Sequence, residues 1–299
     1  MISVVIPLYN KEQFIRHTLE AVLGQTFQDF EIVIVDDGST DNSVGEAQKV
    51  SDPRIRIVSQ ENAGVSAARN RGIEEAKYDL IAFLDADDEW KPTYLETQMS
   101  LTEKYPQCNV FATNYEFRDT EGNVRPTIIR RLPFSGEDGI VSNYFEVASH
   151  SHPPICSITI MVRKSAIKEI GGFPVGIAAG EDLLTWARLA VRNEIAYSKK
   201  ALAVFVKDTF VFNTKPRRRP ADEDVVAQEL NKLKKAFPKT KGMKNYISHW
   251  HKMRCAIYYQ LGEKKNSIRE ALKALKHAPL NYKLYAYILL NVVPLKKSH

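Results

Sequence analysis

Two stretches, IVIVDDGS (Ile32–Ser39) and LIAFLDADD (Leu80–Asp88), decide how this chain folds. In each of them an apolar run, typical of a parallel strand covered on both faces, stops at acidic residues. Ligands of open α/β sheets bind just beyond the carboxyl ends of the strands. The two acidic clusters are therefore predicted to line one crevice. Such a crevice suits a divalent cation together with the polar edges of a nucleotide, and it repels a bare phosphate.

The sequence around these stretches alternates between strand and helix patterns. Strands are predicted at Ile2–Pro7, Ile32–Val35, Ile55–Ser59 and Leu80–Leu84. The segments between them carry apolar residues at helical spacing or helix-start signals, and helices are predicted over about 15–23, 43–50 and 64–76. This order predicts the α/β class, with a doubly wound, mostly parallel central sheet flanked by helices.

After residue 88 the pattern is less regular. Helices are predicted at 93–104, 164–170 and 181–192, and strands at 109–113, 158–162 and 201–206. Residues 118–139 contain two prolines and several glycines and are expected to form hairpins or loops. The pair His150 and His152 resembles metal ligands, but no third ligand stands nearby, so we interpret it as part of a loop.

Charge divides the chain near residue 212. Residues 1–212 contain 22 Lys and Arg against 30 Asp and Glu, whereas residues 213–299 contain 20 against 6. The segment Lys215–Pro220 (KPRRRP) is predicted as the boundary, because its prolines exclude a regular helix or central strand. We expect one domain over 1–212 and an all-helical, basic C-terminal extension over 213–299.

Composition narrows the class of protein further. The chain has 299 residues, of which 44% are hydrophobic, as in ordinary globular proteins. Its three cysteines are far apart and form neither a metal-ligand nor a disulfide pattern, which favours a reducing compartment. The N-terminus enters a strand without a signal-peptide pattern, and the longest apolar stretch is shorter than the roughly 20 residues that a membrane span needs. These features predict a cytoplasmic protein.

Four local sequences together resemble the family 2 glycosyltransferases, GT-A-fold enzymes that use nucleotide-diphosphate sugars. They are SVVIPLYN (3–10), IVDDGSTD (34–41), ENAGVSAARNRG (61–72) and FLDADD (83–88). The resemblance covers roughly residues 1–210. It implies that 1–110 bind the nucleotide-sugar, with UDP favoured, and that 111–212 bind the acceptor. It further implies a role in cell-surface polysaccharide synthesis, with a glycan or lipid-linked saccharide as acceptor.

The resemblance also implies how the nucleotide is bound. Pro7 and Tyr9 would hold the base, the tyrosine ring by stacking on a pyrimidine. Asp37 would accept a hydrogen bond from the imide N–H of uracil. Asp36 has two interpretations of equal weight, a contact with the ligand or an Asx-type turn with the residues that follow it.

The resemblance implies a diphosphate site formed by Arg69 and by the DxD motif, which is Asp85-Ala86-Asp87 in this chain. Arg69 would contact the base or the diphosphate, and a salt bridge to Asp87 or Asp37 is the alternative. On an extended segment Asp85 and Asp87 would point to the same side. The resemblance implies Asp87 as the direct ligand of Mn²⁺ or Mg²⁺, with Asp85 as its partner near the ribose. Asp88 would either add to this site or cap the following helix.

The segment GED (180–182) matches the Glu-Asp pair of the family. Asp182 is the implied general base, which removes the proton of the acceptor hydroxyl, and Glu181 would touch a hydroxyl of the acceptor or the sugar. A single displacement of this kind inverts the configuration of the sugar. The alternative is that both acids merely stabilise a helix N-terminus. Trp186 would either line the acceptor site or pack in the core.

The basic extension has three interpretations. We favour a helical cap with a solvated basic face, and peripheral contact with the anionic inner face of the cell membrane is compatible with it. Nucleic-acid binding is not expected, because no recognition motif is present.

Two other functions of the whole chain fit the sequence less well. A sugar nucleotidyltransferase usually has a glycine-rich, basic phosphate loop, which is missing after Pro7. A non-catalytic nucleotide- or carbohydrate-binding module would have no reason to retain all of Asp37, Asp85, Asp87 and Asp182.

Overall fold

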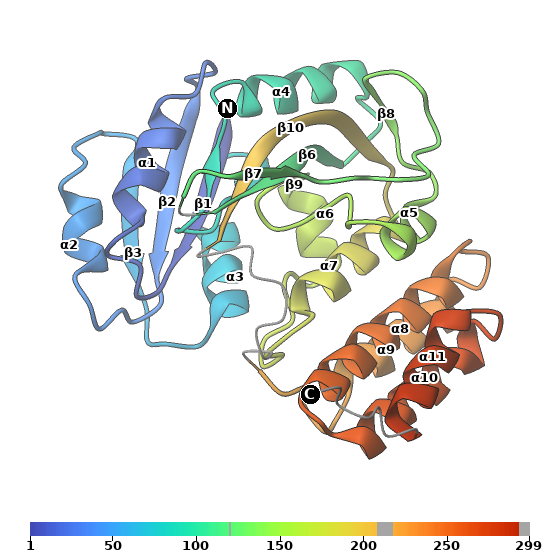
Figure 1. Ribbon diagram of the computed structural model, residues 1–299. Coiled ribbons are helices and arrows are strands. Elements are labelled where there is room, and N and C mark those ends of the chain that lie inside the picture. The colour runs from blue at the N-terminus through green and yellow to red at the C-terminus, as the bar shows by residue number, and fades with distance from the viewer. Residues whose placement is uncertain (120, 208–217, 293–299) are drawn as a thin grey trace. The chain divides into compact units, whose positions relative to one another are not determined.

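The computed structural model describes residues 1–119, 121–207 and 218–292, which fall into two compact units (Figure 1). The first unit is built from 1–142 and 151–207, and the second from 143–150 and 218–292. Residues 143–150 precede the predicted boundary and yet belong to the second unit. The predicted boundary segment itself lies largely outside the described residues.

The first unit is organised around a mixed sheet. Its strands lie in the order β3-β2-β1-β4-β9-β6-β10-β5, with β7 paired to β6 and β8 to β10. The strands are β1 Ile2–Leu8, β2 Phe30–Asp36, β3 Ile55–Ser59, β4 Leu80–Phe83, β5 Glu89–Trp90, β6 Val110–Asp119, β7 Val124–Pro126, β8 Asp138–Ile140, β9 Ile160–Arg163 and β10 Ile195–Lys207. The helices are α1 Ile15–Leu23, α2 Ser43–Gln48, α3 Val65–Glu75, α4 Tyr94–Lys104, α6 Lys164–Glu169 and α7 Glu181–Ala190.

The N-terminal part of this sheet is parallel. β1 pairs in parallel with β2 and β4, and β2 pairs in parallel with β3. This is the doubly wound α/β arrangement that the alternating pattern predicts. Beyond β4 the sheet becomes mixed, because β9 runs antiparallel to both β4 and β6 while β10 is again parallel to β6.

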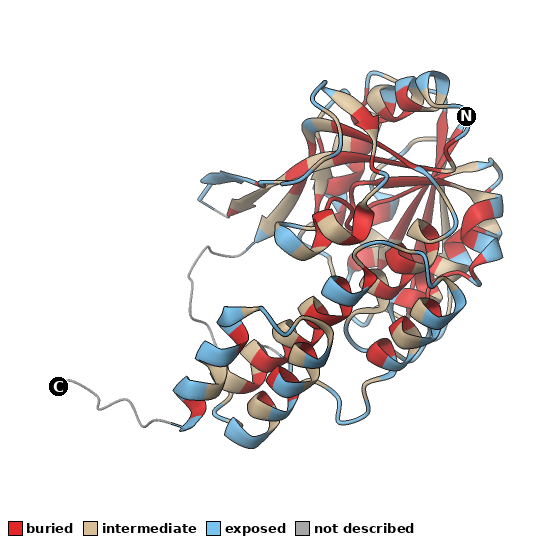
Figure 2. Ribbon diagram, turned by 90° about the vertical axis from the view of Figure 1, so that its right-hand side faces the viewer, coloured by how far each residue is buried: buried red, intermediate tan, exposed pale blue. Residues whose placement is uncertain are grey.

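Helices cover both faces of the sheet. Successive side chains of a strand point to opposite faces, so Ile2, Val4, Ile6 and Leu8 of β1 share the main core with apolar residues of α1. On the other face β1 and β2 pack against α3. The buried residues are concentrated along these strands (Figure 2). The carboxyl ends of β1, β2 and β4 are thereby held at one edge between two layers of helices.

Gly72 lets α3 approach β1 closely. A Cβ atom at this position would lie 2.2 Å from Cγ1 of Val5, whose buried, branched side chain has no room to move. We expect Gly72→Ala to destabilise the protein by about 1–2 kcal/mol, because overpacking costs about 1–3 kcal/mol and the better helix propensity of alanine returns up to about 1 kcal/mol. Thermal unfolding of this variant measures the effect.

Gly136→Ala is the matched control, because its Cβ would make only an ordinary contact, 3.5 Å from the carbonyl oxygen of Asp138. The control should unfold at the temperature of the native chain. An unchanged unfolding temperature for Gly72→Ala would show that close packing of α3 on β1 is not needed.

Two strands are longer than predicted. β10 begins at Ile195 rather than Ala201, and β6 continues to Asp119, into a region expected to be loop or hairpin. The two strands pair in parallel from Val110 opposite Ile195 to Asp119 opposite Lys207, with irregularities in the middle. Each strand supplies hydrogen-bond partners for the other, a long-range effect that local sequence does not reveal.

The prediction for His150 was wrong. It is the last residue of helix α5 (Tyr144–His150) rather than part of a loop with His152. The rings of Tyr144 and Phe145 pack against Tyr246, with centroid separations of 6.1 and 5.3 Å. Seven residues are too few for a helix that is stable by itself, so packing within the second unit determines this element.

The second unit is entirely helical in its described residues, as predicted for the chain from Asp222 onward. Besides α5 it contains α8 Val225–Ala236, α9 Met243–Gln260, α10 Lys264–His277 and α11 Tyr282–Val292. The long helix α9 contacts each of the other four. Among the described helices, none combines the length and the apolar character that crossing a bilayer requires.

Candidate active site

The predicted nucleotide residues lie where the strand order reverses. β1 stands between β2 and β4, so its carboxyl end is a topological switch point, the usual ligand position in open α/β sheets. Pro7 is in β1 and Tyr9 follows it, with 46% of Tyr9 exposed. Asp36 ends β2 on one side, and Asp85 follows β4 on the other. The structure thus gathers the two acidic stretches at one edge.

The loops after β1 and β2 are tied together. Asn10 adopts a positive φ of 51°, which asparagine tolerates better than most residues. Its side-chain oxygen accepts a hydrogen bond from the amide of Thr40 at 2.8 Å. Asp36 accepts one from the amide of Ser39 at 3.0 Å, which is the turn interpretation of this residue. Contact of Asp36 with a ligand stays a prediction.

Asp37 is buried and holds the start of the next strand-to-helix connection. Its carboxylate accepts hydrogen bonds from the Gln60 side chain at 2.7 Å and from the amides of Ala63 and Gly64 at 2.9 and 2.8 Å. A carboxylate offers about four acceptor positions, so these three donors do not use all of them. The sequence did not predict this structural role.

Arg69 is buried beside Asp85. Its Nη2 donates to Oδ1 of Asp85 at 2.7 Å, so the salt-bridge alternative is present, but with Asp85 rather than with Asp87 or Asp37. Within the described residues Nε and Nη1 have no hydrogen-bond partner. The other oxygen of Asp85 accepts from Ser157 Oγ at 2.8 Å. Ser157 was missed, since a lone serine before a strand carries no signal.

The DxD motif is a turn rather than the extended segment predicted. The amide of Asp88 donates to the carbonyl of Asp85 at 3.1 Å and closes the turn. Asp87 forms an ion pair with Lys11, the residue that directly follows the β1 signature. Lys11 was not predicted from the sequence. Its ammonium group occupies a position to which Asp87 would otherwise attract a metal cation.

Lys11→Ala is expected to tighten the binding of Mn²⁺ to the nucleotide-free protein by roughly three- to tenfold. The reason is that removing a neighbouring positive charge, which repels another unit charge by about 1 kcal/mol even in bulk water, favours the binding of a second cation. Calorimetric titration of Mn²⁺ measures this. Lys49→Ala, an exposed lysine paired with Glu46, should leave the affinity unchanged, and weaker Mn²⁺ binding by Lys11→Ala would contradict the assignment of Asp87.

Asp88 neither caps the following helix nor faces solvent. It is buried, and its carboxylate accepts a hydrogen bond from the amide of Val206 in β10 at 2.8 Å. Burial and the nearby charges of Asp85 and Asp87 raise its pKa well above the ordinary value. Asp88 therefore anchors the motif to the far half of the sheet.

Glu181 and Asp182 occupy the first turn of α7, which begins after Gly180 in a left-handed conformation with φ 88°. Glu181 Oε1 lies 3.9 Å from Nη1 of Arg69. Asp182 accepts a hydrogen bond from the amide of Leu183 at 2.7 Å. Burial raises the pKa of both carboxyl groups, and Asp85 adds to this, whereas Arg69 opposes it. The predicted base is thus brought beside the DxD motif.

The loop before α7 contributes a buried aromatic ring, that of Phe173, which packs against Arg69. The guanidinium of Arg69 lies over the ring of Phe173, 5.2 Å from its centroid. Asn70 exchanges two hydrogen bonds of 2.8 Å with the backbone of Phe173. Trp186 is fully buried and contacts the same ring edge-on at 5.5 Å. Of its two interpretations the core one applies, and Phe173 supports Arg69 from below.

The electrostatics of the site fit a divalent cation. Five carboxyl groups, those of Asp85, Asp87, Asp88, Glu181 and Asp182, are gathered with the cations Lys11 and Arg69. Burial is the first cause of the raised pKa values of Asp88, Glu181 and Asp182, and the negative charge of neighbouring carboxylates adds to it. Hard oxygen ligands with surplus negative charge are what Mg²⁺ and Mn²⁺ prefer.

A second group of potential metal ligands lies in the helical unit. One ligand atom each of Asp224, His251 and Glu270 lies within 4.8 Å of the others. However, Nε of Arg254 is 3.1 Å from Asp224 and 3.4 Å from Glu270. Because a guanidinium already neutralises both carboxylates, we interpret this group as a buried ion-pair network that joins α8, α9 and α10.

Comparison with solved structures establishes the fold class. The chain superposes on a crystal structure of residues 1–349 of TarS from S. aureus in complex with UDP-GlcNAc, with a TM-score of 0.72. The alignment covers 97% of this chain and 88% of that one at 18% sequence identity. The fold is therefore of the GT-A glycosyltransferase type that the sequence motifs imply.

Sequence comparison then establishes the family. Residues 3–171 match the family described as Glycosyl transferase family 2, and the chain belongs to this family. It is 45% identical over 125 residues to the uncharacterized glycosyltransferase YibD of Escherichia coli (strain K12), covering 40% of this chain and 36% of YibD. It is 31% identical over 200 residues to TuaG of Bacillus subtilis (strain 168), a glycosyltransferase assigned to teichuronic acid biosynthesis, covering 66% of this chain and 75% of TuaG.

Proposed function

We propose that this chain is a metal-assisted, inverting glycosyltransferase that moves a sugar from a nucleotide-diphospho-sugar to a hydroxyl of a glycan or lipid-linked acceptor. The observation that carries the proposal is the convergence of Asp85, Arg69, Glu181 and Asp182 at the switch point of the sheet. Residues that are far apart in sequence, and that resemblance links to one reaction, are close together in the fold.

The donor is proposed to be a UDP-sugar. The exposed ring of Tyr9 offers a stacking surface, and Asp37 retains an acceptor position for an imide N–H. Nε and Nη1 of Arg69 have no hydrogen-bond partner in the described part of the chain, although burying such donors is costly unless a ligand uses them. The structural neighbour TarS was solved with UDP-GlcNAc, which supports the same class of donor here.

Asp182 is proposed as the general base. Its burial next to Asp85 raises its pKa toward the working range of a base. Once ionised, the carboxylate accepts the proton of the acceptor hydroxyl while the hydroxyl oxygen forms its bond to the anomeric carbon and the bond to the diphosphate breaks. Attack from the side opposite the leaving group inverts the configuration. The amide of Leu183 fixes one carboxylate oxygen and leaves the other for the proton.

Asp87 and Asp85 would hold a Mn²⁺ or Mg²⁺ ion. When bound, this ion supplies Lewis-acid stabilisation of the negative charge on the departing nucleoside diphosphate. Two side chains of the protein also balance the charge of these carboxylates, because Lys11 pairs with Asp87 and Arg69 pairs with Asp85.

The wider setting follows from the relatives. We propose a role in the synthesis of a bacterial cell-envelope polysaccharide, as TuaG is assigned to teichuronic acid biosynthesis. Residues 1–110 would bind the donor and 111–212 the acceptor, and the basic extension, 213–299, would make peripheral contact with the inner face of the membrane. Three buried, free cysteines fit a reducing cytoplasm. YibD aligns over about a third of its length, so these assignments are proposals for the whole protein.

Calorimetric titration with UDP, GDP, dTDP and CDP, with and without Mn²⁺, tests the donor site. We expect one diphosphate, UDP, to bind in a Mn²⁺-dependent manner, and Asp87→Ala to abolish that dependence. Asp79→Ala, which removes an exposed carboxylate paired with Arg163, should bind UDP as the native chain does. A folded protein that binds none of the four diphosphates would refute the proposed transferase and favour the binding-module alternative.

A further inference from the structure

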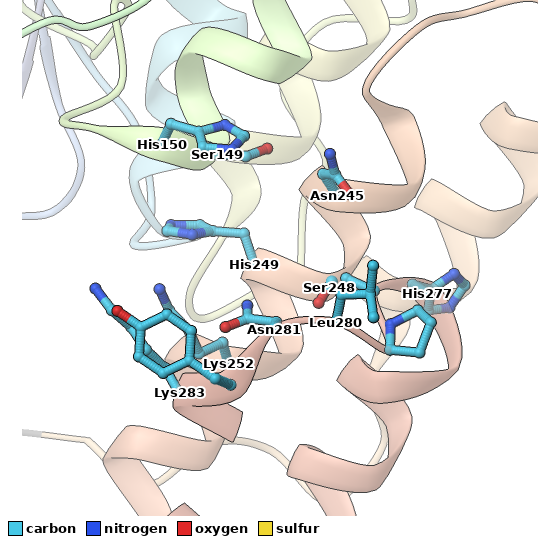
Figure 3. Close-up of a pocket in the computed structure, with 13 residues that line it drawn as sticks. Ser149, His150, Asn245, Ser248, His249, Lys252, His277, Leu280, Asn281 and Lys283 are labelled. Atoms are coloured by element: carbon cyan, nitrogen blue, oxygen red, sulfur yellow. The ribbon is translucent and has the colours of Figure 1, made fainter. Parts of the chain in front are cut away.

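The helical unit contains a cavity of about 620 Å³ that the sugar-transfer proposal does not use (Figure 3). It is enclosed by α5, α9, the end of α10 and the beginning of α11, all within one compact unit. Its lining residues are Ser149, His150, Asn245, Ser248, His249, Lys252, His277, Ala278, Pro279, Leu280, Asn281, Tyr282 and Lys283.

The charge of this lining is one-sided. It contains two lysines and three histidines, and no carboxylate lines the cavity within the described residues. Lys252 and Lys283 have no ion-pair partner in that part of the chain, and burial together with Lys283 lowers the pKa of Lys252. Figure 3 shows the side chains of His249, Lys252 and Lys283 gathered on one side of the cavity. Such surplus positive charge suits an anion.

Uncharged donors face the same cavity. Ser248 is only 1% exposed, and its Oγ has no hydrogen-bond partner among the described residues. A buried hydroxyl without a partner is uncommon and calls for an explanation such as a missing ligand. The side chain of Asn281 lies beside it in Figure 3. Burial, followed by Lys252 and His150, lowers the pKa of His249 to about 4, so its ring is neutral near pH 7 and leaves the positive charge to the lysines.

The rim of the cavity continues into an exposed apolar stripe. Leu280 is 93% and Tyr282 75% exposed, and both also line the cavity. Tyr282, Tyr285, Leu289 and Val292 recur at spacings that place them on one face of α11, and all are exposed. An apolar stripe that carries aromatic residues beside lysines is typical of a helix lying in a membrane interface.

We propose that this cavity binds the phosphate group of an anionic lipid, with the stripe of α11 lying at the boundary of the acyl chains. Lys252 and Lys283 would supply charge, and Ser248 and Asn281 would donate hydrogen bonds to the phosphate oxygens. A free phosphate would use the polar lining but not the apolar rim, and the rim therefore favours the lipid. The proposal names the residues of the membrane contact proposed above and does not depend on sugar transfer.

Co-sedimentation of the full chain with phosphatidylcholine vesicles, with and without phosphatidylglycerol, tests the site. We expect binding only when phosphatidylglycerol is present, and a loss of tenfold or more in the double variant Lys252→Gln/Lys283→Gln, because each basic residue near an anionic surface contributes about fivefold. The matched control is Lys235→Gln/Lys239→Gln, which removes the same charge from exposed positions outside the cavity. If both double variants lose vesicle binding equally, the proposed phosphate pocket is refuted. General electrostatic attraction between the basic helices and the vesicle surface would then explain the binding.

Ser248→Ala separates hydrogen bonding from charge. Because Ser248 has no hydrogen-bond partner to lose among the described residues, this variant should fold normally, and we expect it to weaken vesicle binding by about three- to tenfold. Unchanged vesicle binding in Ser248→Ala would overturn the proposed contact. If inorganic phosphate binds through these residues while vesicles do not bind, the lipid proposal is refuted. The ligand of the cavity would then be a soluble phosphate compound. UDP titration of the same variants should match the native chain, so failure here is distinct from failure of the donor site.

Discussion

Asp182→Asn is expected to lower the rate of sugar transfer by about 10²–10⁴-fold while the affinity for the nucleotide-sugar changes by less than about twofold. The amide side chain has the shape of the carboxylate and keeps an oxygen for the hydrogen bond from Leu183, which is 2.7 Å long in the structure. It cannot, however, take up the proton of an acceptor hydroxyl. The loss should therefore appear in kcat and leave donor binding intact.

The measurement combines a transfer assay with donor titration. Asp79→Asn is the control, since this carboxylate is 60% exposed and pairs with Arg163 at the surface. Because burial raises the pKa of Asp182, the rate of the native enzyme should fall as the pH drops through a pKa above the usual range of an aspartate. Full activity of Asp182→Asn, or an unaltered acid limb in its residual rate, would exclude Asp182 as the base.

Arg69→Met is expected to destabilise the first unit by about 2–4 kcal/mol. Removing one partner of a buried ion pair leaves the other charge uncompensated, at a cost of about 3–5 kcal/mol when both are fully buried. The side chain of Arg69 is 4% exposed but that of Asp85 is 23% exposed, so water reduces this cost. Thermal unfolding measures it, and a domain of this size loses about 2–4 °C per kcal/mol.

Arg71→Met provides a control on the same helix. Arg71 is 47% exposed and pairs with Glu75 one turn away, an arrangement worth less than about 1 kcal/mol. Arg69 also lowers the pKa of Asp182, so Arg69→Met should shift the acid limb of the pH–rate profile to higher pH, a change that Arg71→Met should not produce. Equal unfolding temperatures for the two variants would show that Arg69 does not stabilise the fold and that its role is to bind the ligand.

Much of the fold could be predicted because local patterns determine it. Each apolar run at β1 to β4 ends at a polar motif, and strands alternate with helices, which restricts the sheet to the doubly wound arrangement. The all-helical character of the C-terminal extension was likewise predicted, and the elements among its described residues are helices. The identities of Asp85, Asp87 and Asp182 were recognisable because they occur within motifs, and their place at strand and helix ends follows from the periodicity around them.

Contacts between distant residues were beyond the reach of these patterns. Ser157 on Asp85, Lys11 on Asp87, and Phe173 beneath Arg69 join segments that only the completed sheet brings together. The pairing of β6 with β10 and the docking of α5 on α9 depend in the same way on partners far along the chain. The sequence by itself determined the alternating elements from β1 to β4 and which chemical groups follow them. The tertiary structure decided which charges meet, because ion pairing and burial are set by proximity in space.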